Sequence, residues 1–389
     1  MNKKAHFSSN PYMSLKRAAA ILVLSASFSG TVQGSDPGTT SANFLKLGVG
    51  PRAIAMGNAQ VGLADDVYAT YWNPAGLARL ETPQAGFVHN QFIESIAEEY
   101  LGFAYPHPTL GTLGVSVTYL NTGTFPGYDA VGTPTTDVGA SDTAMGLSYA
   151  RSIYRDRSLG TEVSLGMTGR LIHERLDTVT ANAYAADLGV VFQPGLQAGG
   201  LFEGWKAGLT LRNLGTSLKY DKESFPLSRS IDAGISYTGI VFGEDVAFAV
   251  DGRKPSDGTQ SVGAGLEVTT FRSFILRAGY DTAGDLGSGV RLGAGLKFKT
   301  IQIDYAFVPS GDFGNANYIG LTYRFRQVPA DPKFLAEKAY QKGLKEYRKR
   351  RFTEALVDFN KALELDPSHP DALRLMKQTY DQIKIIVPE

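Results

Sequence analysis

From about residue 84 to residue 325, apolar residues alternate with small or polar residues at a period of two, and turn residues break the pattern into runs. One run places Leu113, Val115, Val117 and Tyr119 on one face and Gly114, Ser116 and Thr118 on the other. Successive side chains of a strand point to opposite faces, so each run predicts a strand with one apolar face. Counting the runs predicts fourteen strands, an even number that fits a closed antiparallel outer-membrane barrel. A β-sandwich alternates in the same way, so alternation alone leaves both folds open.

The lengths of the expected connections favour the barrel. If the first strand rises from the periplasm, three of the longest connections lie outside, at residues 121–141, 173–182 and 214–228. Most inner connections are short, at about residues 107–110, 240–243, 270–272 and 299–300, and residues 194–205 are the exception. Long outer loops and short inner turns are typical of outer-membrane barrels, so we expect an all-β transmembrane barrel.

The flanking segments have other compositions. Residues 1–34 carry Lys16 and Arg17 ahead of a short apolar run and small residues up to Gly34, which indicates a secretory signal peptide. The chain has no cysteine, which excludes disulfides, a thiolate metal site and a lipid-anchored cysteine. The expected order is a signal peptide at 1–34, an N-terminal hatch at 35–83, the barrel at 84–325, a linker at 326–333 and a helical tail at 334–389.

The segment from Leu45 to Leu80 shows neither a sustained helical stripe nor strand alternation. It runs into Asn73, Pro74, Ala75 and Gly76. Pro74 lacks an N–H group and disfavours the helical region for the residue before it, so these four residues predict a turn. An irregular segment ahead of a strand series indicates a plug that folds inside the periplasmic mouth of the barrel.

The same segment resembles the N-terminal hatch of FadL-type outer-membrane channels. The resemblance lies in the ordered series FLKLGVGPRAIAMG, then ADD at Ala64 to Asp66, then YWNPAGLA, and it is closer still to the PorV/PorQ branch of that superfamily. In FadL-type channels the hatch holds a hydrophobic ligand, and a kinked third strand, here about residues 112–120, opens a sideways path into the membrane. In PorV-type proteins the barrel serves the type IX secretion system as a carrier or attachment partner. A turn-rich segment of a soluble β-domain is the alternative.

Charged residues on the faces opposite the apolar ones form four expected pairs on neighbouring strands. The pairs are Arg170 with Asp187, Arg212 with Asp232, Glu267 with Arg277, and Arg291 with Asp304. A basic side chain facing lipid at mid-membrane costs about 2 to 4 kcal/mol, so we expect these charges to face inward and hold a narrow lumen together. We interpret them as structural rather than as substrate contacts.

The sequence contains no recognisable catalytic constellation. The five histidines are scattered, and Asp65 with Asp66 fits a helix or turn cap better than a cation site. We therefore expect no enzyme activity, no cofactor and no metal. Acidic side chains outnumber basic ones between residues 35 and 330, which argues against a nucleic-acid partner. The expected partners are outer-membrane lipid and either a hydrophobic small molecule or a periplasmic or secreted protein.

The segment after the linker has helical spacing and resembles a single tetratricopeptide repeat. The residues that carry the resemblance are Ala336, Ala339, Gly343, Tyr347, Phe352, Ala355, Phe359, Ala362 and Pro367. A third helix is expected from Pro370 to about Ile386, and a plain helical hairpin is the alternative. An even strand count places this tail in the periplasm, where we expect a docking groove lined by Tyr340, Leu344 and Tyr347.

Two functions remain open at this stage. The barrel either binds or passes a hydrophobic ligand, or serves as a secretion or attachment partner at the outer membrane. A strictly structural or scaffolding barrel, whose tail recruits a partner protein, is the further alternative.

Overall fold

The computed structural model describes residues 38–92, 96–156, 160–195, 203–283, 287–325 and 332–386. The expected signal peptide at 1–34 and most of the expected linker lie outside these residues. Among the described residues, no helix is both long enough and apolar enough to cross a membrane.

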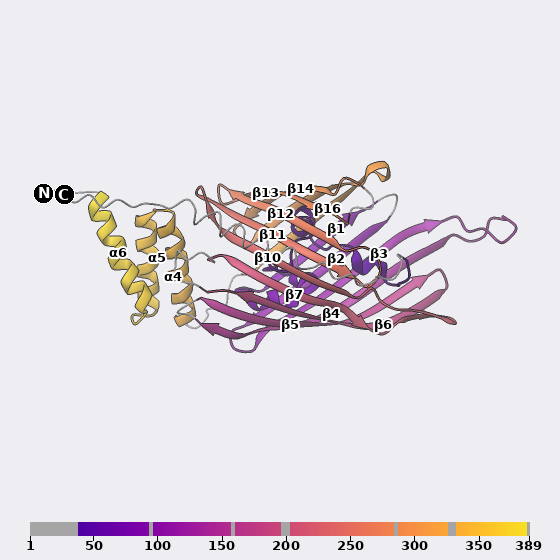
Figure 1. Ribbon diagram of the computed structural model, residues 1–389, viewed down its shortest axis with the longest axis horizontal. Coiled ribbons are helices and arrows are strands. Elements are labelled where there is room, and N and C mark those ends of the chain that lie inside the picture. Colours follow the sequence, from indigo (N-terminus) through magenta and orange to yellow (C-terminus); the bar gives the residue numbers. More distant parts are fainter. Residues whose placement is uncertain are drawn as a thin grey trace.

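Fourteen strands form one closed antiparallel sheet, which confirms the expected barrel (Figure 1). In chain order they are β1 Gln84–Gln91, β2 Ala97–His107, β3 Gly111–Phe125, β4 Val138–Asp156, β5 Thr161–Leu176, β6 Val179–Gln193, β7 Trp205–Gly215, β10 Ser230–Val241, β11 Glu244–Pro255, β12 Ser261–Thr270, β13 Phe274–Asp281, β14 Val290–Phe298, β15 Ile301–Pro309 and β16 Asn315–Arg324. Each strand pairs with its neighbours in the chain, and β1 closes the sheet against β16, with Gln84 opposite Arg324. A separate hairpin, β8 Leu218–Tyr220 and β9 Glu223–Phe225, lies in the connection between β7 and β10.

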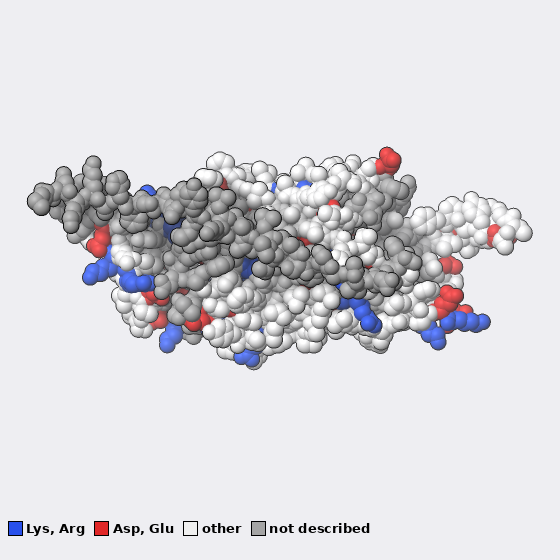
Figure 2. All heavy atoms as spheres, viewed as in Figure 1, with Lys and Arg blue, Asp and Glu red and all other residues white. Residues whose placement is uncertain are grey.

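The two faces of the sheet differ as the alternation predicts. The apolar residues of β3 from Leu113 to Tyr119 are exposed on the outside, and Leu147 of β4 is 64% exposed. The inner face carries mostly alanine, glycine, serine, threonine and charged residues, with a few larger side chains such as Tyr100 and Tyr318. Among the described residues visible in Figure 2, Lys, Arg, Asp and Glu gather toward the two ends of the molecule, with few of them between. The barrel therefore has an apolar outer band and a polar, small-residue interior.

The two ends of the barrel differ in length and in what covers them. The C-terminal helices lie at the end where β16 finishes, which we call the tail end; the opposite end is the far end (Figure 1). At the far end β3 and β4 project beyond the other strands. The expected outer loop at 173–182 is not a loop, because β5 and β6 continue to Leu176 and Val179. Only a tight turn joins them, with Asp177 at a φ of 54°.

The hatch occupies the interior of the barrel. Its short helices are η2 Asn43–Lys46, α2 Pro51–Ala55, α3 Ala69–Trp72 and η3 Pro74–Arg79. Most of its apolar residues are less than 5% exposed, so the main core lies between the hatch and the wall. The hatch is not confined to one mouth: η3 leads into β1 at the tail end, whereas Ser41 pairs with Leu227 beside the β8–β9 hairpin at the far end.

Three helices form the tail: α4 Pro332–Arg348, α5 Phe352–Leu365 and α6 Pro370–Ile386. Their core contains Phe359, which is fully buried, with Ala355 and Ala362. Gly343 lets α4 approach α5 closely, because a Cβ there would lie 2.7 Å from the Phe359 ring.

Candidate functional site

The Asn73 side chain forms hydrogen bonds both within the hatch and to the wall of the barrel. Its backbone is extended, as expected for a residue before proline, and its Oδ1 accepts a hydrogen bond of 3.1 Å from the Ala75 N–H. Its Nδ2 donates to the carbonyl oxygens of Val61 in the hatch, at 2.7 Å, and Val190 in β6, at 3.2 Å. The side chain is completely buried. The amide of Asn73 therefore joins the turn of the hatch to the sixth strand of the wall.

Glycines in the wall receive the backbone of the hatch. A Cβ on Gly189 would lie 2.1 Å from Asn73 Oδ1, and a Cβ on Gly166 would lie 2.3 Å from the Ala75 nitrogen. The same close approach recurs around the barrel at Gly86, Gly114, Gly208, Gly263, Gly265, Gly279, Gly293 and Gly320. The hatch thus packs against the small inner-face residues that the sequence pattern shows.

The third strand is regular where the resemblance implied a kink. β3 pairs without interruption with β2 from Gly111 to Asn121, and with β4 from Thr112 to Asn121. The hatch side chains Thr70 and Leu77 lie over Gly114, so the missing side chain, rather than a kink, makes room for them. A register shift near the hatch falls instead between β6 and β7, where the Asp187 carboxylate accepts a 2.8 Å hydrogen bond from the Asn213 N–H.

Three of the four expected lumen pairs are in contact. Arg170 lies 2.6 Å from Asp187, Arg212 lies 3.5 Å from Asp232, and Arg277 lies 2.6 Å from Glu267. All six side chains are largely buried and face the hatch side of the wall.

The expected pair of Arg291 with Asp304 does not form. Arg291 contacts Asp281 at 3.0 Å, and Asp304 contacts Arg277 at 2.7 Å. The strand register explains the exchange. Asp304 lies opposite Gly295, four residues along β14 from Arg291, whereas Arg291 lies opposite Gly279, two residues from Asp281.

Sequence reasoning missed Arg52, which connects the hatch to the wall by charge. Its guanidinium forms two hydrogen bonds of 2.9 Å with Glu267 and a 2.5 Å bond with Asp65. Asp66 instead caps the following turn, accepting a 3.0 Å bond from the Tyr68 N–H. The sequence offered one signal, the spacing of Arg52 from the Asp65-Asp66 pair. The wall residue that Arg52 binds, Glu267, lies more than two hundred residues away in the sequence.

An arginine from the wall lies over two hatch aromatics. The Arg212 guanidinium carbon is 4.3 Å from the ring centre of Tyr71 and 5.8 Å from that of Trp72. The Tyr71 hydroxyl donates to the Leu45 carbonyl at 3.0 Å, and the Trp72 indole N–H donates to the Val49 carbonyl at 2.7 Å. These contacts tie the middle of the hatch both to its own N-terminal part and to β7.

A second apolar cluster, which we call the far-end cluster, lies beneath the β8–β9 hairpin. Phe44 and Leu45 of the hatch pack there against small wall residues of β4 and β6 and against larger ones nearby. The other buried members are Ala42, Leu120, Ala144, Ile172, Ala181, Ala183, Ala185, Leu218 and Leu227. The Ser41 N–H donates to the Pro226 carbonyl at 3.0 Å, which holds this part of the hatch against the far-end connection.

The docking groove expected on the tail is filled by the tail itself. Tyr340 and Leu344 are buried, with the Tyr340 ring 5.9 Å from Phe359 and 4.9 Å from His369. Burial, together with the nearby carboxylates of Asp371 and Glu337, raises the pKa of Tyr340 to about 12. Tyr347 is half-buried and stacks edge-on with Phe352. With three helices only, this face of α4 is needed for the internal core.

The tail contacts the tail-end turns of the barrel through ion pairs. Lys345 lies 2.8 Å from Asp245 beside the β10–β11 turn, and Arg348 pairs with Glu203 ahead of β7. Lys338 lies 3.1 Å from Glu81, which connects the hatch to β1. The basic end of α4 thus faces acidic residues of the barrel.

A closed barrel with an apolar outer band and a hatch packed against its inner wall defines a plugged β-barrel of the membrane type. No protein-family model matches the chain, and no curated protein matches it. Among solved structures, the CymD monoaromatic hydrocarbon channel is similar with a TM-score of 0.49 and 13% identity, covering 72% of this chain and 98% of CymD. The Pseudomonas putida toluene transporter TodX gives 0.48 and 12%, covering 75% and 98%. A Pseudomonas aeruginosa FadL homologue gives 0.45 and 9%, covering 76% and 99%.

Proposed function

We propose that this chain is an outer-membrane barrel that passes a hydrophobic small molecule, with the N-terminal part of the hatch as its gate. The observation that carries the proposal is the far-end cluster. Phe44 and Leu45 fill a space whose wall is formed by alanines of β4 and β6 and by larger aliphatic residues. When residues 40–47 withdraw, that wall borders an apolar cavity able to hold a small apolar solute.

The placement in the membrane rests on the surface and the connectivity. An outer band of exposed aliphatic side chains buries its apolar area in hydrocarbon, and a closed sheet leaves no backbone edge unpaired there. β1 starts and β16 ends at the same end, so the polar tail stays on the side from which the chain enters. With an exported chain that side is the periplasm.

A reversible lock on the gate tests the proposal. Ser41 and Leu227 are partners in a parallel β-bridge, and the chain has no cysteine, so Ser41→Cys with Leu227→Cys introduces a single disulfide. In a Gram-negative host, uptake of radiolabelled toluene and of oleate should fall to the background level when the pair is oxidised and recover on reduction. The single-cysteine variants are the controls. Equal uptake by the oxidised and reduced forms would contradict the gate.

A protein-binding role, as in a secretion or attachment partner or a scaffold, is the second candidate. An exposed apolar cleft between α5 and α6 favours it, with a volume of about 610 Å³ lined by Leu356, Val357, Leu373, Met376 and Tyr380. Deletion of residues 326–389 separates the candidates. The channel predicts unchanged toluene uptake after deletion, whereas the adaptor predicts that a photo-crosslinker at Val357 captures one periplasmic protein that the same group at Glu354 does not.

A further inference from the structure

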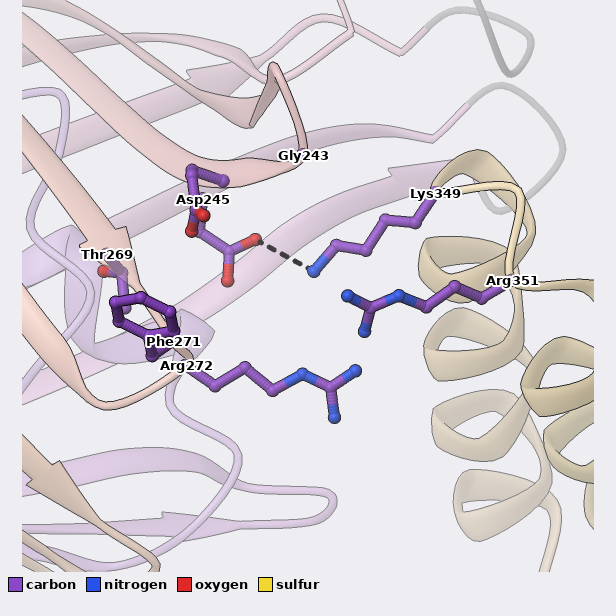
Figure 3. Close-up of a pocket in the computed structure, with 8 residues that line it drawn as sticks. Gly243, Asp245, Thr269, Phe271, Arg272, Lys349 and Arg351 are labelled. Atoms are coloured by element: carbon purple, nitrogen blue, oxygen red, sulfur yellow. Dashed lines mark ion pairs between the residues drawn. The ribbon is translucent and has the colours of Figure 1, made fainter.

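A cleft of about 390 Å³ lies where the tail meets the rim of the barrel (Figure 3). Its walls are the start of β11 with Glu244 and Asp245, the β12–β13 turn with Phe271 and Arg272, and the residues after α4 with Lys349 and Arg351. The guanidinium groups of Arg272 and Arg351 point from opposite sides into the space between the turn and the helix end.

The β12–β13 turn has a backbone that its residues do not favour. Phe271 and Arg272 have φ values of 48° and 62°, where glycine or asparagine is usual, and each such residue costs about 1 kcal/mol. The turn also leaves Phe271 82% exposed, and the neighbouring Phe242 has a φ of 52° and is fully exposed. A bulky aromatic side chain that points outward from such a backbone indicates an environment in which an exposed apolar ring is favourable.

The neighbours of Phe271 identify that environment. Its ring packs edge-on with Phe274, with 6.5 Å between the centroids, and Phe274 is exposed on the outer apolar face of β13. The turn therefore extends the outer band at its tail-end edge, where aromatic side chains favour the boundary between hydrocarbon and headgroups. Arg272, the next residue, turns into the cleft.

The cations of the cleft are loosely paired. Arg272 and Arg351 each lie 3.5 Å from the same oxygen of Glu346, which is beyond the usual length of a charge-assisted hydrogen bond. The Lys349 side chain is only 7% exposed, yet its ion pair with Asp245 is 3.8 Å long. Three basic side chains and the two carboxylates of Glu244 and Asp245 thus line the cavity, so basic groups outnumber acidic ones by one, and one of the basic groups is an almost buried ammonium.

We propose that this cleft binds the phosphate of a phospholipid from the membrane leaflet at the tail end, with the acyl chains lying along Phe271 and Phe274. This inference rests on the membrane placement in the proposed function. Two guanidinium forks and an ammonium group match the geometry and charge of a phosphodiester. The adjoining aromatics distinguish a lipid from a dissolved anion, because only a lipid presents phosphate and hydrocarbon together at the rim.

Native mass spectrometry of the full chain, released from detergent in the presence of dioleoylphosphatidylglycerol, tests the site. The unaltered chain should retain one lipid at least tenfold more tightly than the double variant Arg272→Gln with Arg351→Gln. Arg350→Gln is the matched control, because Arg350 is exposed and does not line the cleft. Phe271→Ala keeps every charge and should weaken the same lipid severalfold. Equal retention by all four proteins overturns the proposal.

Two competitors separate the sources of the phosphate. Dioleoylglycerol, which lacks phosphate, should not displace the bound lipid. Displacement by millimolar sodium phosphate would assign the cleft to a free anion and overturn the lipid. Toluene uptake is measured on the same variants and should be unchanged. A failure of the proposed gate would therefore appear only in toluene uptake. A failure of the proposed lipid site would appear only in the number of phospholipids that the protein retains.

Discussion

The Nδ2 atom of Asn73 lies 3.2 Å from the carbonyl oxygen of Val190, and this bond joins the turn of the hatch to the wall of the barrel. Asn73→Ala removes it together with the bonds to Val61 and Ala75. Because the freed carbonyls stay buried, docking of the hatch should weaken by about 1 to 3 kcal/mol. Hydrogen exchange of residues 61–80 should accelerate, while the heat-induced gel shift of the barrel is retained.

Asn73→Asp is the matched control for this change. The carboxylate of an aspartate still accepts the hydrogen bond from the Ala75 N–H but cannot donate to either carbonyl. Hydrogen exchange of residues 61–80 should therefore accelerate in this variant as well, although the bond from Ala75 is kept. Exchange at the rate of the unaltered chain in Asn73→Ala would show that the wall bond contributes nothing to docking.

The wall glycines predict a difference between the two faces of the sheet. Gly189→Ala places a methyl group 2.1 Å from Asn73 Oδ1, so the hatch must shift, whereas a Cβ on Gly169 meets no atom within 4 Å. Overpacking costs about 1 to 3 kcal/mol, so Gly189→Ala should expose the hatch to protease and Gly169→Ala should not. Equal protection of the hatch from protease in both variants would contradict the close packing of the hatch against Gly189.

Arg52 and Glu267 should be energetically coupled. Breaking a buried ion pair from one side costs about 3 to 5 kcal/mol, because the remaining charge stays buried without its partner. Arg52→Gln and Glu267→Gln should therefore each loosen residues 50–60 in hydrogen exchange, and the double variant should lose less than the sum. Strict additivity in this double-mutant cycle would argue against the contact.

The ion pairs between tail and barrel should respond to charge reversal. Each exposed pair contributes about 1 kcal/mol or less, but Asp245→Lys turns attraction for Lys345 and Lys349 into repulsion. Spin labels on cysteines at Thr109 and Lys361 should then show a broader distance distribution, and adding Lys345→Asp should narrow it again. High salt should broaden the distances in the unaltered chain, since it screens surface charges. No change in any of these conditions would contradict electrostatic docking.

The outer face of the barrel was predictable because the pleat of a strand assigns side chains to faces residue by residue. Leu113, Val115, Val117 and Tyr119 face outward for that local reason. Partners across the lumen were less predictable. Arg291 pairs with Asp281 instead of Asp304 because pairing depends on strand register, which alternation does not specify. The position of Asn73 against β6 and the burial of Tyr340 depend on contacts distant in sequence, which no local pattern contains.

The seam between β1 and β16 has a consequence for the order of assembly. The hatch leads directly into β1, and its backbone and side chains lie against wall glycines on strands from β1 to β16. A segment that carries Tyr71 and Trp72 and fits this closely has no route into a barrel that is already shut. We therefore expect the hatch to be enclosed while the sheet is still open, before Gln84 pairs with Arg324. Once the seam has closed, the hatch is retained by topology as well as by its contacts.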